Sequence, residues 1–204
     1  MSLFDELRLV AITDLQQVPA ELSIERWQRL AHAARPRTVA VDLRAPNQPA
    51  RDLLQLGARL RDIAHAAGQL FIAHERLDIA SLLAADALHL REDSVPSEAA
   101  RRLLPHVPIL RACHSVDDLS ALDADAALLS PILEARKGNP ALGLDALRAA
   151  RTAGKLVFAL GGVDAERAAA CLQAGARGVA AIGSALGSEN PEALLRGLDL
   201  LKSR

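Results

Sequence analysis

Two glycine-bearing segments of this sequence could hold an anion, because each one follows an apolar run of strand length. Gly161 and Gly162 follow the run LVFAL, and Gly183 follows the run GVAAI. Glycine lets the backbone approach a ligand closely, and free N–H groups in a loop favour a negatively charged group. We therefore expect a phosphate group to bind at these two turns. Simple turn glycines remain the alternative.

Basic side chains that could clamp a phosphate or a diphosphate occur at two further places. Arg44 ends an apolar run, and Arg136 and Lys137 lie in the segment SPILEARKGNPALGL. Because Arg and Lys in loops often only contact solvent, we place Arg44 above the other two as a candidate ligand.

Three carboxylates gather at the ends of neighbouring apolar runs, namely Glu75, Glu92 and Asp93. Carboxylate oxygens are the ligands that Mg²⁺ prefers, and Mg²⁺ commonly accompanies phosphates. The sequence therefore indicates a possible Mg²⁺ site here. The alternative is a cluster of salt bridges with Arg76 and Arg91.

Three of the six histidines fall on predicted strands or at their ends. His114 ends the run in RACHS, where an imidazole could transfer protons near neutral pH. It could equally cap the next helix. His89 has apolar neighbours in ALHLRED, which is typical of a buried core histidine, and His74 fits either role.

Eight apolar runs of strand length would position these residues. They alternate with amphipathic, helix-like segments, a pattern that favours a parallel sheet. The predicted strands are Leu7–Asp14, Thr38–Arg44, Gln69–Glu75, Ala87–Asp93, Pro108–His114, Ala126–Ile132, Lys155–Gly162 and Gly178–Ser184.

The segments between these strands carry helix signals. Predicted helices cover 24–34, 50–67, 144–153 and 164–174, and shorter ones begin near Ser97, near Ser115 and at Asn190-Pro191. Eight such repeats predict a single α/β domain over residues 1–204, a (β/α)8 TIM barrel. The rival is an open doubly wound sheet, which would show a glycine-rich fingerprint after the first strand, and this chain has none there.

In such barrels the active site lies at the carboxyl ends of the strands, and phosphate commonly binds after the seventh and eighth strands. The two glycine turns follow the seventh and eighth predicted strands, which strengthens the expectation of a phosphate site.

Composition narrows the class of protein. The 24 basic and 25 acidic residues give a net charge of −1, and aromatic residues make up 2%. We expect no nucleic-acid partner, since nucleic-acid-binding proteins carry an excess of basic residues.

No apolar run is long enough to span a membrane, and the first residues lack signal-peptide character. Cys113 and Cys171 show no ligand or disulfide spacing, which predicts reduced thiols in a cytoplasmic protein.

In the order in which they occur, the strand-end residues resemble the thiamine-phosphate synthase/TenI family over nearly the whole chain. The segments that carry the resemblance are AITD at 11–14, VDLR at 41–44, HERLDIA at 74–80, AADALHLRED at 84–93, CHS at 113–115, SPILEARKGNPALGL at 130–144, ALGGV at 159–163 and AGARGVAAIG at 174–183. The resemblance independently implies a TIM barrel.

The resemblance also implies a chemistry. A synthase of this family uses Mg²⁺ and basic residues to hold the diphosphate of an aminopyrimidine (HMP-PP). When the diphosphate leaves, the nitrogen of a thiazole phosphate attacks the resulting carbocation. In TenI-type members, the same pocket binds a thiazole phosphate and only moves protons, with the histidine that matches His114 as the acid and base.

The residues that match the thiazole-phosphate half of the family's site are kept in this chain. The resemblance assigns them to substrate binding, and they are Lys137, Gly161, Gly162, Ile182 and Gly183. Ser130, which stands where the family's motif has Gly, is a further candidate substrate ligand.

The residues that match the diphosphate half are altered. The family's Gln is Asp42, its Lys is Pro46, and its Asn-Asp pair is His74-Glu75. A gapless match puts Ser94 at the second Mg²⁺ carboxylate, so Asp93 stands one residue early.

Three hypotheses follow from this asymmetry. The slightly favoured one is a TenI-like enzyme that transfers protons on a thiazole phosphate through His114. The second is a synthase in which Glu75 and Asp93 hold Mg²⁺, Arg44 together with Arg136 or Lys137 replaces the missing cation, and His74 binds substrate. The third is a non-catalytic protein that binds a thiamine precursor. A homodimer is possible for any of the three.

Overall fold

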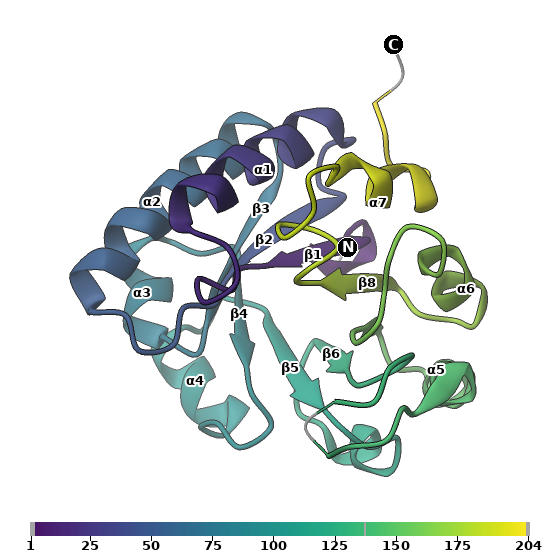
Figure 1. Ribbon diagram of the computed structural model, residues 1–204. Coiled ribbons are helices and arrows are strands. Elements are labelled where there is room, and N and C mark those ends of the chain that lie inside the picture. The colour runs from purple at the N-terminus through teal and green to yellow at the C-terminus, as the bar shows by residue number, and fades with distance from the viewer. Residues whose placement is uncertain (1–2, 137, 203–204) are drawn as a thin grey trace.

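Eight parallel strands form a closed barrel in the computed structural model, which describes residues 3–136 and 138–202. Each strand pairs with the next one along the chain, and the last strand closes the ring against the first (Figure 1). The strands are β1 Leu9–Ile12, β2 Val39–Leu43, β3 Leu70–His74, β4 Ala87–Leu90, β5 Ile109–Cys113, β6 Ala126–Leu129, β7 Val157–Ala159 and β8 Gly178–Ala181. The predicted (β/α)8 barrel is confirmed.

The paired strands are shorter than the apolar runs that predict them. In the run at 155–162, for example, only three residues, those of β7, form a strand. Pairing stops where the chain leaves the barrel wall, although some flanking residues such as Gly161 stay buried. The residues expected at strand ends therefore lie partly in the loops just beyond the strands.

Helices surround the barrel (Figure 1). Within the described ranges they are α1 Ala20–Ala33, α2 Ala50–Ala66, α3 Leu77–Leu82, α4 Ser97–Leu103, α5 Gly143–Thr152, α6 Ala168–Gln173 and α7 Glu192–Gly197, with 3-10 helices η1 Leu3–Asp5 and η2 Asp117–Ala121. In α2, buried Leu53, Leu56, Leu60 and Ala64 recur at helical spacing and face the barrel.

Three helix predictions need correction. The helix expected near Ser115 is only the short 3-10 segment η2, because the Ser115 hydroxyl accepts the Asp117 N–H and closes a local turn. The helix expected at 164–174 begins only at Ala168, since Asp164 accepts the N–H groups of Glu166 and Arg167 and holds them in a turn. The first begins earlier than expected, at Ala20, directly after a proline.

Alternate residues along each strand point into the barrel and fill it with apolar side chains. The buried members of this inner cluster are Phe4, Leu7, Val10, Ile12, Ala40, Leu70, Ile72, Ala87, Leu110, Ala126, Leu128, Phe158 and Ala180. The opposite phase of each strand packs against the helices in a second, larger cluster. Polar side chains of the inner phase are therefore exceptions, and they occur toward the carboxyl ends of the strands.

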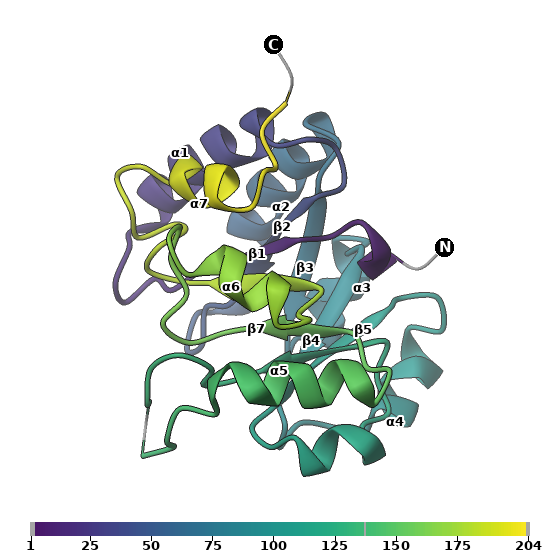
Figure 2. The same ribbon diagram turned by 90° about the vertical axis from the view of Figure 1, so that its right-hand side faces the viewer.

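The loop from β6 to α5 and the N-terminal segment lie at opposite ends of the barrel. The loop from β6 to α5 projects on the left in Figure 2, while the N-terminal segment lies on the right.

Cys113 and Cys171 are both buried free thiols. No helix in the described ranges is long and apolar enough to cross a membrane.

Candidate functional site at the carboxyl ends of the strands

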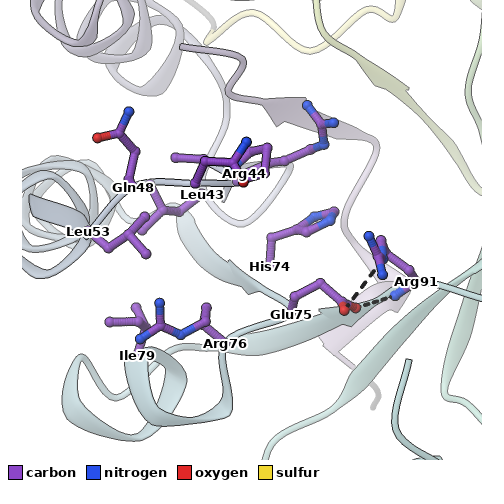
Figure 3. Close-up of a pocket in the computed structure, with 12 residues that line it drawn as sticks. Leu43, Arg44, Gln48, Leu53, His74, Glu75, Arg76, Ile79 and Arg91 are labelled. Carbon is purple, nitrogen blue, oxygen red and sulfur yellow. Dashed lines mark hydrogen bonds and ion pairs between the residues drawn. The ribbon is translucent and has the colours of Figure 1, made fainter. Parts of the chain in front are cut away.

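A cavity of about 240 Å³ opens beside the ends of β2 and β3. Its walls come from the loop after β2, the start of α3 and one residue beyond β4, as Figure 3 shows. The residues that line it are Leu43, Arg44, Ala45, Pro46, Asn47, Gln48, Leu53, His74, Glu75, Arg76, Ile79 and Arg91. Two predicted ligands, Arg44 and His74, and one predicted metal ligand, Glu75, therefore share one cavity.

Arg44 is held in place through its backbone. The Thr13 hydroxyl, just beyond β1, donates to the Arg44 carbonyl at 2.8 Å, and the Arg44 N–H donates to the same hydroxyl oxygen at 2.8 Å. The guanidinium lies 3.6 Å from the Asp14 carboxylate and is partly exposed. This long contact leaves most of its N–H donors available to an anion in the cavity.

Glu75 and Asp93 both contact Arg91. The backbone N–H of Arg91 donates to Glu75 at 2.5 Å, and its Nε lies 3.5 Å from Glu75 and 3.1 Å from Asp93. Arg76 pairs with Asp78 instead. Of the two arginines in the salt-bridge alternative, Arg91 therefore pairs with these carboxylates and Arg76 does not. Mg²⁺ binding stays a prediction. The donor set fits Mg²⁺, since both groups are carboxylates gathered around a single cation.

The backbone at Glu75 adopts a conformation that few side chains tolerate. Its φ is +64°, and its N–H donates to the His89 carbonyl at 2.8 Å, which fixes the turn after β3. Such left-handed residues cost free energy and cluster at ligand-binding sites. The turn directs the Glu75 side chain toward Arg91 (Figure 3).

Asp42 joins two histidines inside the barrel. Its Oδ2 lies 2.6 Å from His89 Nδ1 and 3.3 Å from His74 Nδ1. The two imidazole rings meet edge to face, with centroids 4.3 Å apart. His89 is buried, as expected, but it contacts a carboxylate rather than only apolar neighbours. His74 spans the distance between this buried cluster and the cavity.

His114 directly follows β5 and pairs with Glu92. Its Nδ1 lies 2.9 Å from the Glu92 carboxylate, which also accepts the His114 backbone N–H. The side chain is 40% exposed. A carboxylate on one ring nitrogen fixes the tautomer, so that the other nitrogen could exchange a proton with a ligand. The catalytic role of His114 stays a prediction.

The two glycine turns present free backbone donors. Gly161 and Gly162 have φ of +100° and +71°, and the N–H groups of Gly161, Gly162 and Gly183 donate no hydrogen bond among the described residues. Among the described residues, no atom outside Gly183 and its two chain neighbours lies within 4 Å of the position that a Cβ on Gly183 would take. The Glu134 side chain covers Gly162, with its carboxylate held by Arg167 at 2.8 Å. Glu134 therefore occupies the side of Gly162 on which a Cβ would stand.

The remaining predicted ligands lie around the same end of the barrel. Ser130 follows β6 and is half-buried, and Ile182 follows β8 and is half-buried. Arg136 is exposed and its backbone pairs with Asn139. Lys137 lies outside the described residues.

Comparison with known proteins decides the family. A family model described as "thiamine monophosphate synthase" (TMP-TENI) matches residues 9–185. The chain belongs to this family. The resemblance seen in the strand-end segments is thereby confirmed.

Curated relatives carry the same family name. A protein named thiamine-phosphate synthase from Moorella thermoacetica is 34% identical over 168 residues, which cover 78% of this chain and 80% of the relative. Another protein of that name, from Pyrococcus horikoshii, is 28% identical and covers 97% of this chain and 96% of its own. A solved structure titled thiamine phosphate pyrophosphorylase, from Pyrococcus furiosus, has 25% identity and a TM-score of 0.82, covering 97% and 96% of the two chains.

Three of the departures from the family pattern, Pro46, His74 and Glu75, line the cavity. Pro46, at the position of the family's Lys, is exposed and lines the cavity. Ser94, at the position of the second carboxylate, accepts a hydrogen bond from Arg111 through its carbonyl at 3.2 Å. Arg111 also donates to Glu92, Val95 and Ser97, and so fixes the loop that carries Asp93.

Several of these contacts were not predicted from the sequence. Asn47 and Gln48 line the cavity, but their segment has no ligand signature. The contact of Asp42 with His74 and His89 joins three strands. One signal could have indicated it: all three are polar residues at the inward phase of neighbouring strands, where apolar residues are the rule.

Proposed function

We propose that this protein is a thiamine-phosphate synthase, which joins HMP-PP to a thiazole phosphate and releases pyrophosphate. The altered diphosphate half had favoured proton transfer on a thiazole phosphate. The names of the relatives support the synthase instead. The observation that carries the proposal is the cavity, which three arginines line, Arg44, Arg76 and Arg91, although Pro46 stands at the position of the family's Lys.

The two groups of ligands lie on different walls of the barrel. The cavity belongs to β2 and β3, whereas the free N–H donors follow β7 and β8. A diphosphate at the first wall and a phosphate at the second would bring the two organic groups together above the barrel interior. Holding both substrates in this way supplies proximity, and the fixed cations stabilise the charge of the leaving pyrophosphate.

Each side chain of the cavity has a definite role in this proposal. Arg44 and His74 bind the diphosphate, and Arg91 becomes available to it when Glu75 and Asp93 engage another cation. Mg²⁺, held by Glu75 and Asp93, would neutralise part of the diphosphate charge when bound. Ser130, between the two walls in strand order, would contact the reacting groups.

The test is a coupled assay with the purified chain, HMP-PP, a thiazole phosphate and Mg²⁺. Formation of thiamine phosphate with equal release of pyrophosphate is the expected result. Arg91→Gln should lower kcat/KM for HMP-PP by about 10-fold or more, since a charged contact contributes about 1.5–3 kcal/mol. Arg101→Gln is the matched control, because Arg101 also pairs with two carboxylates, Asp123 and Asp125, but away from the cavity.

Absence of thiamine phosphate under these conditions would refute the synthase proposal. The proton-transfer hypothesis would then be tested by the tautomerisation of a thiazole phosphate. It rests on the His114–Glu92 pair, and His114→Ala should abolish that reaction. If neither reaction occurs while thiazole phosphate still binds, the non-catalytic hypothesis is favoured.

A further inference from the structure

The cluster of Asp42, His74 and His89 is built from three adjacent strands. His74 and His89 are register partners on β3 and β4, and Asp42 lies on neighbouring β2. One potential ligand atom from each residue lies within 4.8 Å of the other two. Among the described residues, no other group of three His, Cys, Asp or Glu side chains meets this condition. Two imidazoles and one carboxylate are a common donor set for transition metals.

The cluster is removed from solvent. The side chains of Asp42, His89 and His74 are 0%, 3% and 10% exposed. The inner phase around them is otherwise apolar, with Ile72 and Leu110 among the neighbours in strand register. A buried carboxylate in such surroundings is costly unless a positive charge compensates it.

The pKa values of Asp42 and His89 are both lowered. Burial alone would raise the pKa of Asp42, but the charges and hydrogen bonds of His89 and His74 outweigh it and hold that pKa well below its usual range. Burial lowers the pKa of His89, although Asp42 opposes the shift.

Hydrogen bonding within the cluster does not satisfy all of its polar atoms. Both histidine Nδ1 atoms are directed at the same oxygen, Oδ2 of Asp42. Oδ1 of Asp42 and Nε2 of His89 are buried and have no partner in the described chain. A cation bound by both carboxylate oxygens would satisfy Oδ1 and also balance the negative charge of Asp42.

We propose that Asp42, His74 and His89 bind one divalent transition-metal ion of the Zn²⁺, Fe²⁺ or Mn²⁺ class. Imidazole nitrogen favours these ions over Mg²⁺, which prefers oxygen. Of the three residues, His74 lines the cavity, which would give an ion a route from solvent to the cluster. This site is separate from the predicted Mg²⁺ ligands, because Glu75 and Asp93 contact Arg91.

Metal binding to the full chain tests the proposal without any substrate. Co²⁺ is the spectroscopic probe, and Zn²⁺ retained after dialysis is counted by elemental analysis. We expect one equivalent of Zn²⁺ per chain and visible Co²⁺ absorption bands that Zn²⁺ displaces. Asp42→Asn and His89→Gln should each weaken binding at least 100-fold, because even the loss of an outer partner of a metal ligand costs about 10–100-fold.

Two control variants make the result specific. His65 pairs with Asp86 at 3.0 Å, but these side chains are 44% and 27% exposed and include only one imidazole. His65→Gln should leave Zn²⁺ and Co²⁺ binding unchanged. Glu75→Gln should also leave both unchanged while weakening Mg²⁺ binding, so that failure of the synthase proposal and failure of the metal proposal are distinguishable.

Absence of retained Zn²⁺ and of Co²⁺ absorption in the parent chain would overturn the proposal, and the cluster would be a hydrogen-bonded triad only. Equal binding in the parent, Asp42→Asn and His89→Gln would overturn it as well. Thermal unfolding checks that each variant is folded. Should Asp42→Asn or His89→Gln not fold, His74→Gln at the less buried position gives the same comparison, with loss of binding expected.

Discussion

Replacing Gly161 by alanine should destabilise the barrel through two separate effects. The φ of +100° at Gly161 lies in the region that side chains rarely adopt. A Cβ there would also lie 3.0 Å from Pro131 Cα and 3.2 Å from the Ile132 nitrogen. Neither segment can easily retreat, since Ile132 N–H donates to Leu160 at 2.8 Å and Leu133 N–H donates to Gly161 at 2.9 Å.

The size of the effect follows from these two contributions. A strained backbone residue costs about 1–3 kcal/mol, and overpacking costs typically about 1–3 kcal/mol. Gly161→Ala should therefore lower the free energy of unfolding by about 2–6 kcal/mol. For a chain of this length, about 2–4 °C is lost per kcal/mol, so Tm should fall by at least about 4 °C.

Urea unfolding, followed by far-UV circular dichroism, measures the change. Gly183→Ala is the matched control, because no atom lies within 4 Å of its added Cβ and its φ is not in the strained region. Its free energy of unfolding should stay within about 0.5 kcal/mol of the parent. A Gly161→Ala variant within 1 kcal/mol of the parent would refute the argument from backbone strain and crowding at this turn.

Two further predictions concern the cavity and the core. Pro46→Lys restores a cation at the cavity rim and should lower KM for HMP-PP by about fivefold, as expected for a partly exposed ion pair near 1 kcal/mol. An equal effect of Pro49→Lys, outside the cavity lining, would show that the gain is unspecific. Burial raises the pKa of Cys171 to about 11, so the native thiol keeps its proton while the unfolded thiol loses it near pH 9. The free energy of unfolding should therefore fall between pH 9 and 11, by at most about 1.4 kcal/mol per pH unit for this group, and Cys171→Ala should remove that part of the slope. An unchanged slope in Cys171→Ala would contradict this assignment.

The barrel could be predicted because its signal repeats along the chain. Each strand is buried on both faces and is therefore a short apolar run, and each run is followed by polar, helix-like spacing. The exact strand limits could not be predicted, since burial extends beyond pairing, as at Gly161. The helix expected near Ser115 could not be excluded either, because the Ser115 hydroxyl closes a local turn, and a serine in that place is also typical of a helix start.

The candidate site could be predicted only in part. Residues that follow strands lie at one end of any parallel barrel, so the positions of Arg44, His74, Glu75 and the glycine turns followed from the fold. Side-chain contacts between neighbouring strands depend on how the strands are aligned along each other. That alignment cannot be read from a single sequence. For that reason His89 was expected to have apolar neighbours, whereas it contacts Asp42, a residue 47 positions earlier in the chain.

The sequential strand order of the barrel also has an evolutionary consequence. Residues 42–94 build the wall around β2–β4, and residues 130–183 build the wall around β6–β8. All of the departures from the family pattern noted above at Asp42, Pro46, His74, Glu75 and Ser94 fall in the first stretch. Under the proposed assignment of one substrate to each wall, substitutions in one stretch would alter the recognition of one ligand while the other wall is left intact. Affinity for each substrate would then be a separately selectable trait in a barrel wound in this order.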